Sequence, residues 1–184
     1  MRKKSSRRLL AGAVASTLLA ISLLAHSSPV RFGPHDVASL FSITKSENKN
    51  EVMYAVHLDA QCSPSGEAPV FAYWRLNEKG PGVLEPLLPL EEKAYGIERQ
   101  RVLSNGGPGG KVELALRAVP TRPIVILTAM NAGRCEARSF VTISGESALL
   151  SNVYVKLSGL RMDYVLLLGL SADRRRVVRE KLTR

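Results

Sequence analysis

The chain has 184 residues, of which 45% are hydrophobic, 5% aromatic and 23% charged. These values fit one globular domain, or at most two small ones, and exclude a collagen, a coiled coil, a disulfide-dense mini-protein and wholesale disorder. The net charge of +10 gathers at the two ends: residues 1–27 and 174–184 each contribute +5, and residues 28–173 are neutral with 15 basic and 15 acidic side chains. Since a nucleic-acid-binding domain needs a basic face within its fold, we expect no nucleic-acid binding.

The N-terminal segment has the three parts of a secretory signal peptide. Residues 1–8 are positively charged, and residues 9–25 are uncharged and mostly apolar. Ala25 and Ser27 place small side chains at the two positions that a signal peptidase reads, which predicts cleavage before Ser28. The sequence therefore predicts a signal peptide over residues 1–27 and export to the periplasm or the medium.

The alternative for this segment is an uncleaved anchor helix, because a mostly apolar stretch of 17 residues lies at the lower limit for spanning a bilayer. No cysteine directly follows the apolar stretch, so a lipoprotein anchor is not supported. After cleavage we expect a flexible leader over residues 28–36, a single β-rich domain over residues 37–184, and no stable membrane span.

The rest of the chain shows the period of two that is typical of β-strands. Alternating apolar and polar side chains predict strands over residues 52–59, 70–76 and 111–119, and the continuously apolar residues 124–130 predict a central strand. Four further strands are predicted over residues 134–144, 152–157, 161–170 and 177–182.

One segment departs from this period. Residues 90–95 consist of helix formers, with Pro89 available for the first turn and Gly96 to end the helix. Turn residues separate the strands and make Arg174–Arg176 a hairpin tip. Together these signals predict an all-β fold, an antiparallel β-sandwich or barrel of about eight or nine strands with one short helix.

The two cysteines, Cys62 and Cys135, both follow the predicted signal peptide. In an oxidising compartment an even number of cysteines favours a disulfide, which would close a loop of about seventy residues. Two free buried thiols are the alternative. A metal site is not expected, because neither cysteine has CxxC spacing or a neighbouring histidine.

Three short motifs carry a resemblance to a known family. They are Ser46-Glu47-Asn48-Lys49-Asn50-Glu51-Val52-Met53-Tyr54, Pro69-Val70-Phe71-Ala72-Tyr73-Trp74-Arg75 and Lys93-Ala94-Tyr95-Gly96-Ile97. In this order they resemble the S-K-N-x-N-x-V-x-Y, P-V-x-x-Y-W and A-Y-G motifs of an uncharacterised bacterial family of exported single-domain proteins. The resemblance spans about residues 40–170 and departs at Glu47, where a lysine is usual. It implies export and one β-rich domain, and it supplies no catalytic residues.

Catalytic signals are sparse. His57 and Asp59 are two residues apart and could form a base with its orienting carboxylate, but no nucleophile motif such as G-x-S-x-G accompanies them. The glycine-rich residues 104–111 lack the glycine spacing and the following Ser or Thr of a phosphate-binding loop. No cofactor is expected.

The aromatic residues point to binding instead. Trp74 is expected in the core, which puts Phe71, Tyr73 and Arg75 on the opposite strand face, as a surface for a ligand or partner or as stabilising cross-strand pairs. The apolar residues 164–168 predict either a central strand or the lining of a barrel that holds an apolar ligand. We therefore expect an exported, non-catalytic binding or structural module for a small apolar molecule or an envelope protein. The alternative is a cell-envelope hydrolase using His57 and Asp59.

Overall fold

The computed structural model describes residues 37–183 apart from residues 47, 105–108 and 160. The predicted signal peptide and leader lie outside these residues, as do residues 105–108 of the glycine-rich segment. Within the described part of the chain, eleven strands and one short helix account for most residues, so the all-β prediction with one helix is confirmed, with more strands than expected. No helix in these ranges is long and apolar enough to cross a membrane.

The strands form one mixed sheet in the order β4-β3-β2-β1-β9-β8-β7-β6-β5, and β10 and β11 extend it from the other edge of β9. The pairs are antiparallel except β1 with β9, which is parallel. The elements are β1 (Val37–Lys45), β2 (Glu51–His57), β3 (Val70–Arg75), β4 (Leu84–Pro86), α1 (Pro89–Tyr95), β5 (Ile97–Ser104), β6 (Gly110–Leu116), β7 (Val119–Asn131), β8 (Arg134–Ile143), β9 (Glu146–Ser158), β10 (Arg161–Ser171) and β11 (Val177–Thr183).

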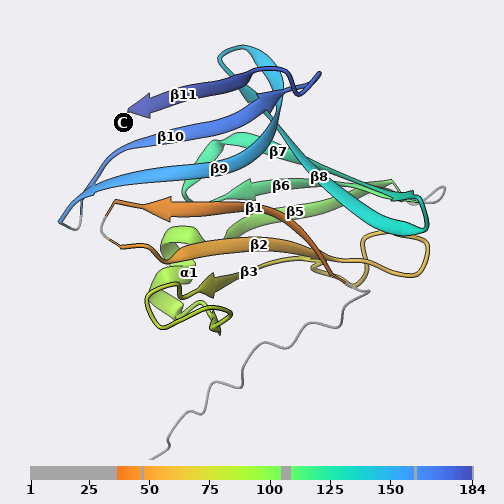
Figure 1. The fold of residues 1–184 in the computed structure, drawn as a ribbon, viewed down its shortest axis with the longest axis horizontal. Coiled ribbons are helices and arrows are strands. Elements are labelled where there is room, and N and C mark those ends of the chain that lie inside the picture. The colour runs from red at the N-terminus through yellow and green to blue at the C-terminus, as the bar shows by residue number, and fades with distance from the viewer. Residues whose placement is uncertain (1–36, 47, 105–108, 160, 184) are drawn as a thin grey trace, which may run out of the picture.

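The long strand β9 divides the sheet into two wings. Its residues 146–149 pair with β8, and its residues 152–155 pair with β1 on the same edge. The opposite edge of β9 pairs with β10 over almost its whole length. The strands β1–β4 form the first wing, which β10 and β11 extend from the other edge of β9. Figure 1 shows β11, β10, β9, β1, β2 and β3 side by side in this order. The strands β5–β8 form the second wing.

The outer ends of the two wings meet through a side chain rather than through a strand ladder. Gln100 on β5 donates from Nε2 to the carbonyl of Val70 on β3 (3.0 Å) and accepts the amide of Val70 at Oε1 (2.8 Å). The side-chain amide of Gln100 thus pairs with the backbone N–H and C=O of Val70. A further strand would be needed here to close the sheet into a barrel. The sheet remains open and is folded over its own core.

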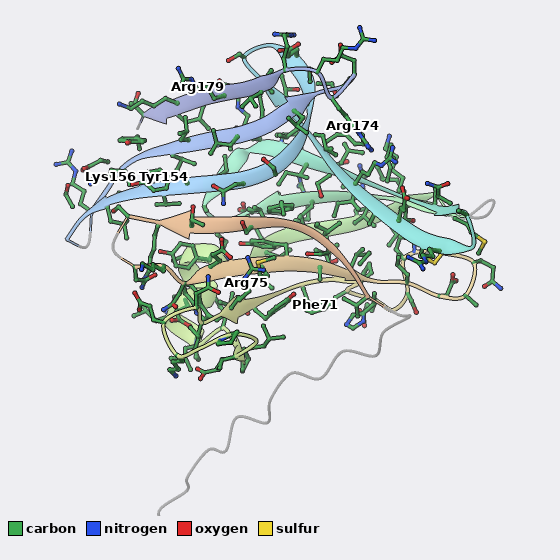
Figure 2. The ribbon with its side chains drawn as sticks, in the orientation of Figure 1. Phe71, Arg75, Tyr154, Lys156, Arg174 and Arg179 are labelled. Carbon is green, nitrogen blue, oxygen red and sulfur yellow. A yellow bond between two sulfur atoms is a disulfide. The ribbon has the colours of Figure 1, made fainter. Side chains whose placement is uncertain are left out.

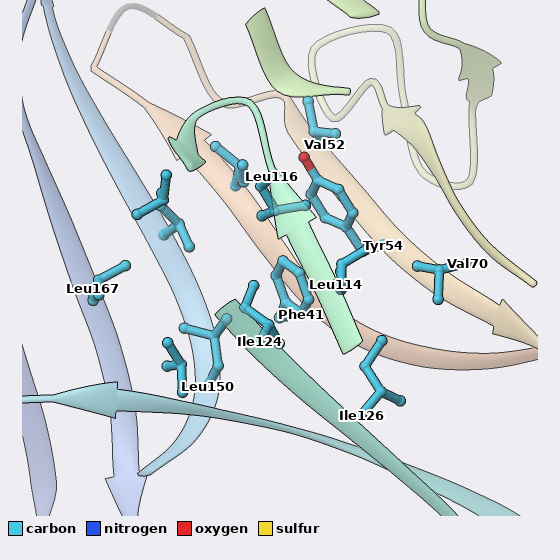
Figure 3. Close-up of a cluster of buried hydrophobic side chains, with 14 of the residues drawn as sticks. Phe41, Val52, Tyr54, Val70, Leu114, Leu116, Ile124, Ile126, Leu150 and Leu167 are labelled. Carbon is cyan, nitrogen blue, oxygen red and sulfur yellow. The ribbon is translucent and has the colours of Figure 1, made fainter. Parts of the chain in front are cut away.

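Apolar side chains from both wings fill the space between them (Figure 3). Phe41 of β1 and Tyr54 of β2 stack with 4.6 Å between ring centroids, and Leu114 of β6 is fully buried. Trp74 is 6% exposed, which confirms its predicted place in the core. In β10, flanked by β9 and β11, Val165 and Leu167 are buried in this core, so these residues form an interior strand of the sheet.

The short helix and the tight turns follow their sequence signals. α1 begins at Pro89, and the amide of Gly96 donates to the carbonyl of Glu92 where the helix ends. The turn between β8 and β9 places Ser144 at φ 50° and Gly145 at φ 84°, two successive left-handed residues. In a two-residue hairpin loop, this conformation matches the right-handed twist of the two flanking strands. The chain reverses again at the tip between β10 and β11, as predicted, where Arg174 has φ 59°.

A disulfide joins Cys62, in the loop after β2, to Cys135 at the start of β8. The Cα atoms are 5.2 Å apart and the residues are 73 positions apart in the sequence. Neither cysteine is free, which decides between the two alternatives left open by the sequence. The bond ties the first wing to the second at the end of the molecule away from α1 (Figure 1).

Tyr54 connects the core to the helix. Its side chain is fully buried, and its hydroxyl donates a hydrogen bond to the carbonyl of Tyr95 at the end of α1. Burial raises the pKa of Tyr54 far above its ordinary value of 10.0, with smaller contributions from Glu92 and Tyr95. The native state therefore holds this proton at a pH where the unfolded chain releases it.

We expect the Tyr54→Phe variant to lose about 1 kcal/mol of stability at neutral pH, because it keeps the ring and loses the donor. The raised pKa of Tyr54 also destabilises the wild type above pH 10, where only the unfolded chain loses the proton. Urea unfolding at neutral and alkaline pH should show that the free energy of unfolding falls less for the variant than for the wild type as the pH rises. An equal loss in both proteins would contradict the role given to Tyr54.

Candidate binding sites

His57 and Asp59 each make a local structural contact. His57 is the exposed last residue of β2, and its ring stacks on Phe71 with 4.4 Å between centroids. Asp59 lies beyond the strand, where its Oδ1 accepts the amides of Gln61 (2.9 Å) and Ser63 (2.8 Å). The strand predicted over residues 52–59 ends at His57, so Asp59 is not part of it. No group of three potential metal ligands occurs among the described residues.

Phe71, Tyr73 and Arg75 lie on the face of β3 opposite Trp74, as the alternation predicted. The rings of Phe71 and Tyr73 are 5.9 Å apart, and Arg75 donates from Nε to Glu51 of β2 (2.8 Å). Partial burial raises the pKa of Tyr73, and the positive charge of Arg75 opposes this. These three residues begin a larger surface.

The strand registers show how far this surface extends, because partners in register lie on the same face. One row of partners runs from β3 to β11 through Arg75, Glu51, Thr44, Tyr154, Leu166 and Lys181. The next row runs through Tyr73, Met53, Ser42, Asn152, Leu168 and Arg179. We call these two rows, together with Phe71, Lys156 and Tyr164, the outer face.

The outer face combines rings, polar groups and cations (Figure 2). Tyr154 and Tyr164, on β9 and β10, have ring centroids 6.3 Å apart, and the Nζ of Lys181 lies 4.2 Å from the centroid of Tyr164. In the middle, Asn152 donates from Nδ2 to the hydroxyl of Ser42 (2.9 Å). Aromatic faces and fixed cations on one side of a sheet can bind a ligand by stacking and by charge.

A second candidate site is a cavity of about 650 Å³ beside α1, which we call the α1 cavity. It lies where α1, the ends of β1 and β9, the start of β10 and the turn between β6 and β7 meet. Its wall is mostly apolar and includes Leu90, Ala94, Tyr95, Ala118, Val155, Leu157 and Met162.

Three cations and one carboxylate complete this wall: Lys45, Lys93, Arg117 and Glu91. The Oε2 of Glu91 accepts the amide of Leu88, and the Nζ of Lys45 lies 5.5 Å from the centroid of the Trp74 ring. None of the three cations takes part in an ion pair among the described residues. The α1 cavity is therefore an apolar recess with an excess of positive charge.

The sequence did not predict the α1 cavity. Lys45, Lys93 and Arg117 belong to three distant segments and share no motif, so only the fold brings them together. The one available signal was α1 itself, a helix with no buried residue, which leaves Leu90 78% exposed. Tyr95, at the end of α1, packs against the core, whereas Leu90, near its start, keeps an exposed apolar side chain beside the recess.

Comparison with protein families gave a match to the model of a domain of unknown function, DUF4833, over residues 41–181. A search of curated proteins gave no match, and neither did a search of solved structures. The family match covers most of the chain and agrees with the expected resemblance to an uncharacterised domain family. The chain belongs to the DUF4833 family.

Proposed function

We propose that the protein is an exported, non-catalytic carrier that holds a small amphiphilic molecule, mostly apolar and with an acidic group, in the α1 cavity. The observation that carries this proposal is the pairing of an apolar wall with three cations in one recess of about 650 Å³. Binding pockets for small molecules commonly have volumes of roughly 300–1,000 Å³ and mostly apolar walls with a few polar groups.

The apolar part of the ligand would lie against Val155, Leu157 and Met162 of β9 and β10. Each methylene group removed from water there contributes about 0.8 kcal/mol, which favours an aliphatic chain. Val155 is 2% exposed and belongs to the core, so this part of the wall is held rigidly by the sheet. A preformed wall lowers the conformational entropy that is lost when the ligand binds.

The acidic group would lie among Lys45, Lys93 and Arg117. These side chains surround the recess from β1, α1 and the turn after β6, while Glu91 is the only carboxylate among the described residues of its wall. A carboxylate or phosphate in this place would gain charge-assisted hydrogen bonds. A cationic ligand of the same shape would meet like charges, so the recess selects by sign as well as by shape.

We expect the wild type to bind a fluorescent long-chain fatty acid and the Ala94→Trp variant to bind it at least about tenfold more weakly, because the indole fills the recess. Ala94 is exposed on α1, so the variant should fold. The matched control is Ala129→Trp, at an exposed alanine of β7 outside the α1 cavity, which should bind as the wild type does.

A Lys45→Ala, Arg117→Ala variant should bind the fatty acid more weakly and the corresponding fatty alcohol unchanged. Failure of the wild type to bind the fatty acid would contradict the proposal. Equal weakening by the two tryptophan substitutions would also contradict it, because the bound probe would then lie outside the α1 cavity.

A further inference from the structure

The part of the outer face on β9, β10 and β11 has no role in the α1 cavity, and its charges are unbalanced. Its cations are Lys156, Arg179 and Lys181, and none of them takes part in an ion pair within the described ranges. The single carboxylate of the two rows is Glu51, and Arg75 neutralises it. Positive charge therefore remains at the β11 side of the outer face.

The carboxylate of β11 nearest to these cations points the other way. Glu180 pairs in register with the buried Leu167, so it lies on the opposite face of the sheet. There it forms an ion pair with Arg122 of β7 and accepts the amide of Ser144. The strand thus separates its charges by face, with Arg179 and Lys181 outward and Glu180 inward.

Aromatic rings lie between these charges. Tyr154 and Tyr164 are neighbours on β9 and β10, and Lys181 covers the ring of Tyr164 from β11. At the other side of the face, Phe71 and Tyr73 stack along β3. The π face of a ring is negative and attracts the partly positive C–H groups of a sugar ring, as it attracts a cation.

We propose that the outer face binds an acidic polysaccharide, a chain of sugar rings that carry carboxylates. Neighbouring strands are about 4.8 Å apart, so the face from β3 to β11 is roughly 24 Å wide. The strand spacing is close to the repeat of one sugar unit in an extended chain. A chain crossing the strands can therefore place a sugar ring on Tyr154 and carboxylates beside Arg179 and Lys181.

Two observations favour a polysaccharide over a single-stranded nucleic acid. The central groups Ser42, Thr44 and Asn152 form a partly buried, uncharged polar network, where a nucleic-acid surface would carry further cations. The Cys62–Cys135 disulfide is of the kind that persists in oxidising compartments outside the cytosol.

The test measures binding of the full mature protein to polygalacturonate, to neutral dextran of equal length and to a single-stranded oligothymidylate. We expect the protein to bind polygalacturonate, more weakly as salt is added, and to bind dextran little. The Arg179→Ala, Lys181→Ala variant should bind polygalacturonate roughly tenfold more weakly, because two fixed charges are lost.

The matched control is Arg99→Ala, Lys111→Ala, which removes two exposed positive charges from the second wing and should keep wild-type affinity. Ala94→Trp should also bind polygalacturonate normally, which separates this surface from the α1 cavity. Absence of binding, equal binding of dextran, tighter binding of oligothymidylate, or equal weakening by both double variants would each overturn the proposal.

Discussion

The Cys62→Ala, Cys135→Ala double variant should unfold with a free energy about 4 kcal/mol below that of the oxidised wild type. The disulfide joins residues 73 positions apart, so its loss frees a long loop in the unfolded chain. Chemical unfolding of both proteins measures the difference, and reduced wild type is the control, because it should unfold like the variant. Equal midpoints for the oxidised wild type and the variant would show that the bond contributes nothing to stability.

The Leu114→Ala variant should lose about 2–5 kcal/mol of stability, because Leu114 of β6 is fully buried between the two wings (Figure 3). The matched control is Leu127→Ala on the neighbouring strand β7, where the leucine is 44% exposed and the expected loss is below about 1 kcal/mol. Urea unfolding compares the two. Similar losses would contradict the packing of the second wing against the first.

Strand alternation predicted the regular strands and failed where a bulge interrupts the register. In β9 the prediction began at Asn152, while the strand begins at Glu146. The register with β10 shifts between Leu168 and Gly169, where Ser151 is left unpaired. A bulge moves every later side chain to the other face, so the two halves of β9 show opposite alternation in the sequence.

Interrupted register also explains why the sequence predicted no separate strand for β1 or for β5. β1 has a register shift between Ser39 and Phe41, and β5 has shifts near Arg99 and near Val102. β5 is also an edge strand and carries several charged side chains, as edges commonly do. β4, with three residues, is too short to show any period.

The candidate sites were predictable only as far as local alternation extends. Phe71, Tyr73 and Arg75 could be placed on one face because they occupy a single regular strand. Their continuation to Tyr154 and Lys181 depends on the parallel pairing of β1 with β9, which joins residues more than one hundred positions apart. The α1 cavity depends on the same pairing, since Lys45 and Val155 are register partners that both line it.

Native mass spectrometry of the protein, purified without detergent from the cells or culture medium that contain it, tests the carrier proposal most directly. We expect a reproducible extra mass that is lost on denaturing extraction and that corresponds to an acidic amphiphile. The Ala94→Trp variant, purified in the same way, should lack this mass, and Ala129→Trp should retain it. A wild-type protein that shows only the mass of its own chain would contradict the proposal that the α1 cavity holds a ligand.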